Sequence, residues 1–498
     1  TARKKTIWQM KSVEIFGYIK SLSKGEKQGL HLTSSPSRKS PLYLKLAEEI
    51  HKAENYDPGL LQRRLRINSA QLRKAFEYLF QHAIRSNLFF REKDDPESIL
   101  AAARHLMSRG CFSLALGEIR RGKELAADRE QFLLWMAFLR LEKQASTKDI
   151  RKAVNREIKM VRSFLDELDQ LERLEERMRA RVRVKDMDAD LYFEAIQQDL
   201  DGFKASSRHA KSVQLVLRRM LATYRERFSL AVAIGEQTVA FLQEHTFLEN
   251  RDQLLMRELG QIAALSIHLR DKTGIDRWLG QLLALQTDSP AIRLQKLERY
   301  CMLRITYAGD TGDVASGQAA LNIIEKEIGH FAENLATERF HLLCFFTSWF
   351  LYMMGDSEES LKYISRIDLR TKDQPQNDMR GFVRLLELLN RYALGEWDLD
   401  NELRSARRYF SQSHRNVKLP FVALSALRDL SRGQLTRQTV LDETVAEIRS
   451  LLSEKQEKRA NRYMNLQSVF EALAQKQPLW MVIQTNQQTA AKAKGASG

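Results

Sequence analysis

The chain has 498 residues, and 80 Lys and Arg against 64 Asp and Glu give it a formal charge of +16. Its 22 glycines and 8 prolines argue against a turn-rich β-sandwich or barrel, because ordinary usage is about 7% and 5%. The length predicts roughly three domains of ordinary size. The basic balance permits binding to nucleic acid, to acidic proteins or to an anionic membrane surface, and selects none of them.

The cysteines and the apolar runs predict a cytoplasmic protein without a membrane span. Cys111, Cys301 and Cys344 are far apart in the sequence, which excludes a disulfide framework and fits a reducing compartment. Residues 1–30 lack the continuous apolar segment of a secretory signal peptide. The most apolar run, LLCFFTSWFLYMM at 342–354, is shorter than the ~20 residues that cross a bilayer, so we expect a buried helix there.

A basic N-terminal helical domain is expected over residues 1–95. Residues 1–44 carry nine basic side chains and only two acidic ones. Three helices are predicted in the rest of this domain from apolar residues at helical spacing. The Asp-Pro pair at 57–58 predicts the start of the second helix, and Asn68 or Ser69 predicts the cap of the third.

A helix, a short turn and a second helix recur from residue 96 to residue 484, which predicts an all-α solenoid. The clearest unit, at 98–126, resembles a tetratricopeptide repeat: small residues allow two antiparallel helices to approach, and Gly110 ends the first helix. In that motif the aromatic after the turn, here Phe112, packs back into the hairpin. Further turns are predicted about 40 residues apart, at residues 226, 273, 312, 355 and 395.

The whole pattern predicts a right-handed stack of roughly nine or ten helical hairpins. Within it, the charge-rich run at 165–186 has leucines three or four residues apart and predicts one long amphipathic helix. Residues 485–498 are small and polar, and we expect a flexible tail there.

Motifs that carry chemistry are missing from the sequence. The ten histidines are scattered, and no His or Cys pair has the spacing of metal ligands. There is no phosphate-binding glycine loop and no Gly-x-Ser-x-Gly elbow. Cys111 and Cys344 are interpreted as core residues. We therefore predict a protein that is not an enzyme and that uses no metal or cofactor.

The segment 56–84 resembles a helix-turn-helix, with a short helix, a three-residue turn and a longer helix. Three arginines would contact phosphates, and three polar residues would stand where a reading helix meets base edges. The alternative is a small basic domain that packs on the solenoid. The six candidate residues are Arg63, Arg64, Arg66, Gln71, Arg73 and Lys74.

A concave groove is the second candidate site. In tetratricopeptide-like stacks the first helix of each hairpin lines a groove that binds peptides. Aromatic anchors with basic groups suit an extended acidic or apolar peptide segment. The alternative is that these side chains are ordinary core or rim residues. The residues expected to face the groove are Arg104, Met107, Trp349, Tyr352 and Tyr392.

Several stretches are similar to the uncharacterised, all-helical, tetratricopeptide-like proteins of Bacteroidota. The resemblance is best over the first 90 residues and over 340–410, and it implies an all-helical repeat fold without implying an activity or binding residues. The stretches that carry it are IKSLSKGEK at 19–27, residues 43–65, residues 71–88, MGDSEESLKYISRI at 354–367 and residues 380–410.

Together these features predict a non-enzymatic scaffold that binds a protein or peptide segment in the groove of a helical-repeat solenoid. The alternative is a nucleic-acid-associated regulatory protein that uses its basic N-terminal domain.

Overall fold

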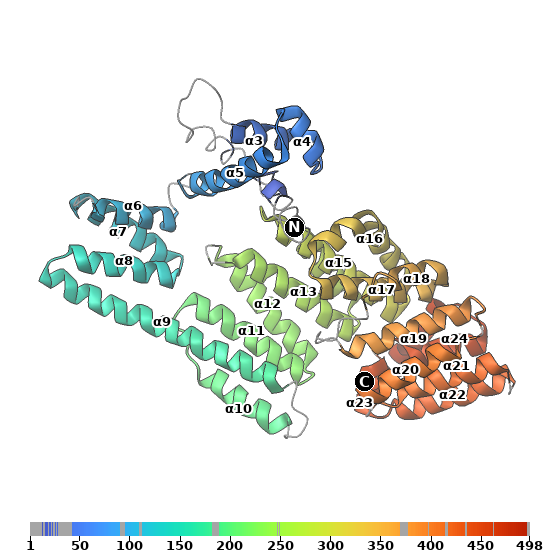
Figure 1. Ribbon diagram of the computed structural model, residues 1–498. Coiled ribbons are helices and arrows are strands. Elements are labelled where there is room, and N and C mark those ends of the chain that lie inside the picture. Colours follow the sequence, from blue (N-terminus) through green and yellow to red (C-terminus); the bar gives the residue numbers. More distant parts are fainter. Residues whose placement is uncertain are drawn as a thin grey trace. The chain divides into compact units, whose positions relative to one another are not determined.

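Every regular element in the described part of the chain is an α-helix in this computed structural model (Figure 1). This confirms the all-α class. No helix within that part combines the length and the apolar character needed to cross a bilayer. The structure describes isolated positions between 12 and 27, Leu248, and residues 42–89, 95–108, 112–181, 189–246, 250–368, 377–396, 398–413, 417–433, 436–461 and 463–495.

Three N-terminal helices share a hydrophobic core of their own: α3 (Leu42–Lys52), α4 (Pro58–Leu65) and α5 (Ser69–Phe89). The start signals act as predicted. The Asp57 carboxylate accepts a hydrogen bond from the Leu60 N–H at 3.0 Å, and Pro58 stands at the first helical position. Asn68 caps α5, because its side chain accepts from the Gln71 N–H while the Gln71 side chain accepts from the Asn68 N–H.

The contacts divide the chain into two compact units, residues 1–226 with 240–251 and residues 227–239 with 252–498. The boundary expected near residue 95 therefore lies inside the first unit. The core shared by α3, α4 and α5 lies before this position and the core that contains Ile99 lies after it, so a domain boundary near residue 95 stays a prediction.

The first unit continues with helices built along one long helix, α9. Residues near its start pack with α6, α7 and α8, and residues near its end pack with α10 and α11. This confirms the single long amphipathic helix, although residues 182–188 lie outside the described residues. The helices are α6 (Pro96–Ser108), α7 (Phe112–Asp128), α8 (Phe132–Ala145), α9 (Lys148–Arg181), α10 (Ala189–Gly202) and α11 (Arg208–Tyr224).

One detail of the tetratricopeptide resemblance is wrong in this unit. Phe112 is 53% exposed, so it does not pack back into the α6–α7 hairpin. It is the first residue of α7, and the core between these helices is filled instead by Ala103, Ala115 and Ile119. Gly110 and Cys111 lie outside the described residues.

The second unit is a succession of helix pairs joined by tight turns. The bounds of its helices are α12 (Phe228–Glu244), α13 (Arg251–Leu269), α14 (Lys272–Ala284), α15 (Pro290–Thr311), α16 (Val314–Asn334), α17 (Thr337–Met354), α18 (Ser357–Ile364), α19 (Asn377–Ala393), α20 (Asp400–Ser413), α21 (Leu419–Arg432), α22 (Arg437–Leu451), α23 (Lys455–Asn461), α24 (Leu466–Gln475) and α25 (Leu479–Gly495). The last residues of α12, from Ala240 onward, and the first residue of α13, Arg251, belong to the first unit.

The turns between paired helices repeat a left-handed backbone conformation. Each such turn has one residue with φ between +54° and +88°, which ends the first helix and lets the chain reverse. Successive residues of this kind are 38 to 43 positions apart. They are Arg270, Gly312, Gly355, Gly395, Gly433 and Lys476. The predicted turns at 312, 355 and 395 are confirmed, and the turn expected at 273 lies three residues earlier.

Small residues bring α17 and α18 together. The hydroxyl groups of Ser348 and Ser360 lie 2.8 Å apart, and both side chains are fully buried. The apolar run at 342–354 lies within α17 and is buried, also as predicted.

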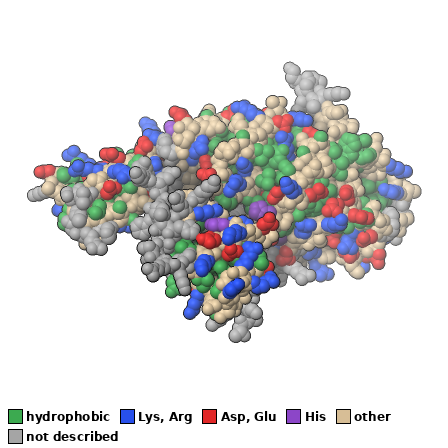
Figure 2. All heavy atoms as spheres, turned by 90° about the horizontal axis from the view of Figure 1, so that it is seen from above, with side chains coloured by type: hydrophobic (Ala, Val, Ile, Leu, Met, Phe, Trp, Pro, Cys, Tyr) green, Lys and Arg blue, Asp and Glu red, His purple; other side chains and the backbone are tan. Residues whose placement is uncertain are grey.

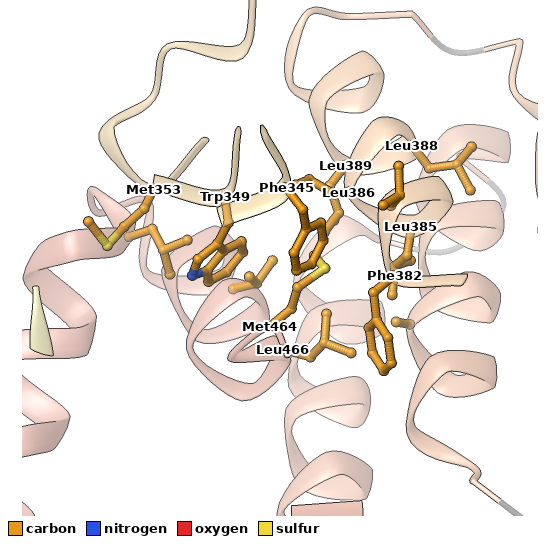
Figure 3. Close-up of a cluster of buried hydrophobic side chains, with 14 of the residues drawn as sticks. Phe345, Trp349, Met353, Phe382, Leu385, Leu386, Leu388, Leu389, Met464 and Leu466 are labelled. Carbon is orange, nitrogen blue, oxygen red and sulfur yellow. The ribbon is translucent and has the colours of Figure 1, made fainter. Parts of the chain in front are cut away.

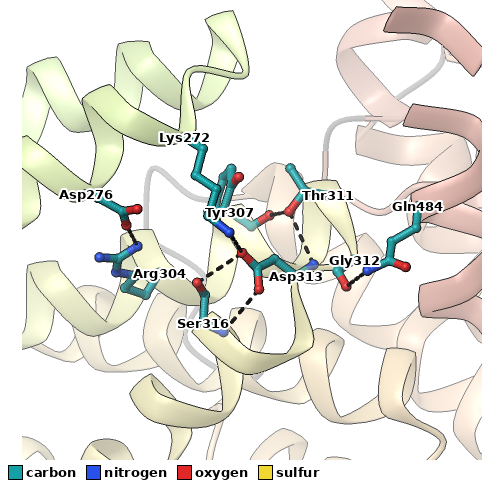
Figure 4. Close-up of polar contacts among 9 residues, drawn as sticks. All are labelled: Lys272, Asp276, Arg304, Tyr307, Thr311, Gly312, Asp313, Ser316 and Gln484. Atoms are coloured by element: carbon teal, nitrogen blue, oxygen red, sulfur yellow. Dashed lines mark hydrogen bonds and ion pairs between the residues drawn. The ribbon is translucent and has the colours of Figure 1, made fainter. Parts of the chain in front are cut away.

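The C-terminal helix closes the second unit on itself. Helix α25 packs against α15 and α17 as well as against its neighbour α24. The Gln484 side-chain amide donates to the Gly312 carbonyl at 3.0 Å (Figure 4). The Gln487 side-chain amide donates to the Asp310 carbonyl at 2.7 Å. The chain is therefore helical as far as Gly495, where a flexible tail was expected from residue 485. The buried Val482 and Ile483 anchor this helix.

Candidate functional site

The aromatic residues of the expected groove lie in the hydrophobic core. Trp349 is 4% exposed and Tyr392 is 5% exposed. Figure 3 shows Phe345 and Trp349 pointing from α17 into a cluster that also contains Leu466 of α24. Little of either groove aromatic is therefore left to contact a partner.

The remaining groove residues are more accessible. Tyr352 is half-buried and its ring stacks on that of Trp349 with 5.9 Å between centroids. Burial raises the pKa of the Tyr352 hydroxyl. Arg104 is exposed and Met107 is half-buried on α6, which belongs to the first unit, whereas the three aromatics belong to the second.

The helix-turn-helix candidates are all on the surface of α4 and α5 and of the turn between them. Four of them already have partners within the chain, and one of these is Arg63, whose guanidinium donates to the Gly59 carbonyl at 3.3 Å. Arg64 pairs with Glu49 at 3.1 Å, and Arg73 pairs with Glu77 at 3.1 Å. Gln71 is used in the cap of α5. Arg63, Arg66 and Lys74 are exposed, and Arg66 adopts the left-handed conformation that ends α4.

Charge by itself selects no binding surface. On the face drawn in Figure 2, Lys and Arg side chains are interspersed with Asp and Glu side chains. A binding site therefore has to be sought where basic side chains converge on one hollow.

Such a convergence lies between α20 and α21. A hollow of about 230 Å³ is lined there by four arginines, one aspartate and two leucines. We call it the arginine hollow. Its residues are Asp400, Leu403, Arg404 and Arg407 of α20 and Leu424, Arg428 and Arg432 of α21.

The two helices run antiparallel across the arginine hollow. Asp400, at the start of α20, accepts two hydrogen bonds from Arg432 at the end of α21, at 3.0 and 3.2 Å. The same carboxylate lies 3.9 Å from the Arg404 guanidinium. Asp400 thereby pairs with Arg432 across the hollow and lies close to Arg404 on its own helix.

The other two arginines are less constrained. Arg428 pairs with its neighbour Asp429 at 3.0 Å. Arg407 is exposed, and it has no ion-pair partner among the residues that the structure describes. Leu403 and Leu424 are buried, so the hollow has an apolar base below a rim of guanidinium groups.

A second hollow, of about 130 Å³, lies on the other side of α20. Arg384 donates to the Ser405 hydroxyl at 2.8 Å, and Arg391 pairs with Glu387 at 3.0 Å. Two arginines and two glutamates line this hollow, so its charges are balanced. Of these two hollows, the arginine hollow is the one with an excess of positive charge.

Nucleophilic and metal-binding chemistry finds little support in the described residues. Burial raises the pKa of the Cys301 and Cys344 thiols to about 12, which keeps both protonated at neutral pH. No group of three or more His, Cys, Asp or Glu side chains is placed to hold a metal ion in this part of the chain.

No protein-family model, curated protein or solved structure matches the chain. A function can therefore be argued only from the residues of this chain. The arginine hollow was not predicted from the sequence, because α20 resembles an ordinary solvated helix. The signal was the arginine spacing on two helices, 404 with 407 and 428 with 432, but only the fold brings the helices together.

Proposed function

We propose that the protein is a helical-repeat scaffold that binds an acidic segment of a partner protein. The observation that carries this proposal is the arginine hollow, where four guanidinium groups surround an apolar base. Clusters of arginine recognise acidic and phosphorylated motifs, because the planar guanidinium group forms paired hydrogen bonds with carboxylate or phosphate.

The repeat architecture that we propose is a tetratricopeptide-like stack. It is supported by the regular left-handed turns and by contacts between alternate helices, α15 with α17, α17 with α19, and α19 with α21. In an open stack each repeat contacts only its neighbours. The return of α25 to α15 departs from that rule, and in our proposal α25 acts as a cap. Membership of the Bacteroidota family and a cytoplasmic location stay predictions.

The size of the arginine hollow favours a partner side chain over a free metabolite. Pockets for drug-sized ligands typically enclose about 300–1,000 Å³. The arginine hollow, at about 230 Å³, is smaller and open to solvent on the rim. Arginine is also among the residues that most often dominate the free energy of protein–protein binding.

Selection from a random peptide library on the immobilised full-length chain tests the scaffold. We expect the selected peptides to be enriched in acidic residues. Reversing two charges of the hollow, Arg407→Glu with Arg428→Glu, should abolish the enrichment. Arg408→Glu is the matched control, because Arg408 is exposed on the same helix and does not line the hollow.

Two outcomes would contradict the scaffold. One is a selection that yields no acidic preference. The other is a preference that survives the double reversal unchanged. Thermal unfolding of each variant shows whether the fold is retained.

Nucleic-acid binding through α4 and α5 is the second candidate function, supported by the exposure of its six polar and basic residues. Labelled duplex DNA and RNA would be titrated at two salt concentrations, because binding through phosphates weakens steeply with salt. Arg63→Glu, Arg64→Glu and Arg73→Glu together should abolish that binding. If these changes have no effect on it, this candidate is rejected.

A further inference from the structure

We propose that the arginine hollow binds a phosphomonoester dianion, presented as a phosphorylated serine or threonine on the partner segment. This inference rests on the proposed scaffold function, and it narrows the chemistry of what the scaffold recognises.

The arrangement of the guanidinium groups is the first argument. Arg404 and Arg407 are one turn apart on α20, and Arg428 and Arg432 are one turn apart on α21. Because the helices are antiparallel, the two pairs face each other across the same hollow. A tetrahedral phosphoryl group offers three acceptor oxygens and can bond to donors on both sides, whereas a planar carboxylate offers two.

The charge balance is the second argument. Four guanidinium groups face two carboxylates, those of Asp400 and Asp429, so two positive charges are left. A phosphorylated side chain carries about −1.5 to −2 at neutral pH and matches this excess. A glutamate or aspartate side chain carries one negative charge and therefore neutralises only half of the excess positive charge.

The neighbouring hollow supplies an internal contrast. It is built on the same helix and is also lined by arginines, but Glu387 and Glu402 balance Arg384 and Arg391. The structure thus places one hollow with a charge excess beside one without. Only the hollow with the excess is suited to an added dianion.

The experiment compares three fluorescent peptides of one acidic sequence with serine, phosphoserine or glutamate at the central position. Each peptide is titrated with the whole 498-residue chain, and fluorescence anisotropy measures its affinity. We expect the phosphoserine peptide to bind about tenfold more tightly than the glutamate peptide. Inorganic phosphate as a competitor separates recognition of the phosphoryl group from recognition of the peptide.

Variants of the hollow should move the affinity in opposite directions. Arg407→Gln and Arg428→Gln should each weaken phosphoserine binding about tenfold, because one guanidinium partner is lost. Asp400→Asn should strengthen it about two- to fivefold, because a nearby negative charge is removed while the Asn side-chain oxygen still accepts a hydrogen bond from Arg432. Arg408→Gln is the control and should leave the affinity unchanged.

The pH dependence of peptide affinity separates recognition of the phosphoryl group from a purely structural role of the arginines. The second proton of a phosphomonoester leaves near pH 6, so phosphoserine binding should strengthen between about pH 5 and pH 7.5. Binding of the glutamate peptide should stay constant over this range, because its carboxyl groups titrate near pH 4.3.

The results separate this inference from the scaffold itself. Equal affinity for the phosphoserine and glutamate peptides overturns the phosphoryl inference and leaves the scaffold in place. Phosphate binding that depends on Arg407, in a chain that selects no acidic peptide from the library, overturns the scaffold and keeps the anion site. A loss in Arg408→Gln as large as that in Arg407→Gln overturns both, because binding would then follow total charge.

Discussion

At the scale of single residues, helix turns in the described part of the chain use left-handed positions that glycine does not always fill. For an L-residue with a β-carbon this conformation costs about 1–2 kcal/mol. Glycine avoids the cost but loses about 0.4–1 kcal/mol through the greater freedom of the unfolded chain. The non-glycine residues with positive φ are Arg66, Glu130, Glu226, Asn250, Arg270 and Lys476.

We predict that Arg270→Gly and Lys476→Gly each raise the free energy of unfolding by about 0.5–1 kcal/mol, the difference between these two effects. Both side chains are exposed, so little else is lost. Urea unfolding measures the change.

Glu130→Gly is the control with the opposite sign. The Glu130 carboxylate accepts hydrogen bonds from the N–H groups of Arg208 and His209 at 2.9 and 2.7 Å, where α11 begins. The stability lost with this cap should be larger than the stability gained by removing the backbone strain at residue 130, because hydrogen bonds to a charged group contribute about 1.5–3 kcal/mol. If Arg270→Gly destabilises the protein as much as Glu130→Gly does, the strain account is wrong.

Asp313 joins two hairpins, α13 with α14 and α15 with α16, at one turn (Figure 4). Its carboxylate accepts from the Ser316 N–H at 3.3 Å, as the cap of α16, and from the Lys272 ammonium at 2.9 Å. Burial raises the pKa of this carboxyl. The contacts with Lys272 and Ser316 together lower the pKa by more than burial raises it, so that it lies below the usual value.

The lowered pKa predicts an acid-dependent loss of stability. Because the folded pKa is below the unfolded value of about 3.9, the ionised carboxylate stabilises the fold above that pH, and the stabilisation is lost as the pH falls through the folded pKa. Asp313→Asn keeps the cap but removes the charge. We expect a weaker decline of its unfolding free energy between about pH 5 and pH 2.5 than in the wild type. Equal slopes would show that Asp313 adds nothing to acid sensitivity.

At the scale of helices, a buried carboxylate from one helix caps the start of another. Glu457 of α23 is fully buried, and it accepts hydrogen bonds from the N–H groups of Lys418 and Leu419 at 2.7 and 2.9 Å. These groups begin α21, where the partial positive charge of the helix favours an anion. Helix α21 carries half of the arginine hollow, so this cap also positions the candidate site.

We predict that Glu457→Ala lowers the free energy of unfolding by about 2 kcal/mol, because two buried N–H groups lose a charged acceptor. Chemical denaturation measures the effect. Glu454→Ala is the matched control, since Glu454 is exposed and pairs with the Lys418 ammonium at 3.5 Å. That surface pair should contribute less than about 1 kcal/mol. Equal effects of the two changes would refute the cap.

At the scale of the whole molecule, the second unit combines a serial stack with a closing contact. Its largest core runs from Leu294 to Ile483 without interruption in the described residues. In a purely serial stack, disturbing the last helix affects only its neighbours. Here α25 also touches α15, which lies far earlier in the chain.

We predict that Val482→Asp speeds amide hydrogen exchange about tenfold or more in the turn between α15 and α16, because it places a charge in a buried contact and undocks α25. Val482 is 2% exposed, whereas its neighbour Met481 is 42% exposed, which makes Met481→Asp the control. Exchange that changes only in α24 and α25 would show that the closing contact carries no stability.

The sequence by itself determined the helices of this protein and many of their ends, because these depend on local interactions. Asp57 before a proline, the cap expected at Asn68 or Ser69 and the turn at Gly355 are all short-range signals that the structure confirms. The buried character of residues 342–354 also follows from their composition, since an apolar segment of that length must leave water.

Only the tertiary structure decided which of these helices meet. The Asp400–Arg432 pair that orders the arginine hollow spans 32 residues, and the hydrogen bond of Gln484 to Gly312 spans 172. No local pattern encodes such distances, because a charged side chain on a solvated helix has the same sequence signature whether or not it faces another helix. The burial of Trp349 and the helical C-terminal segment have the same cause: each depends on a surface that distant residues supply.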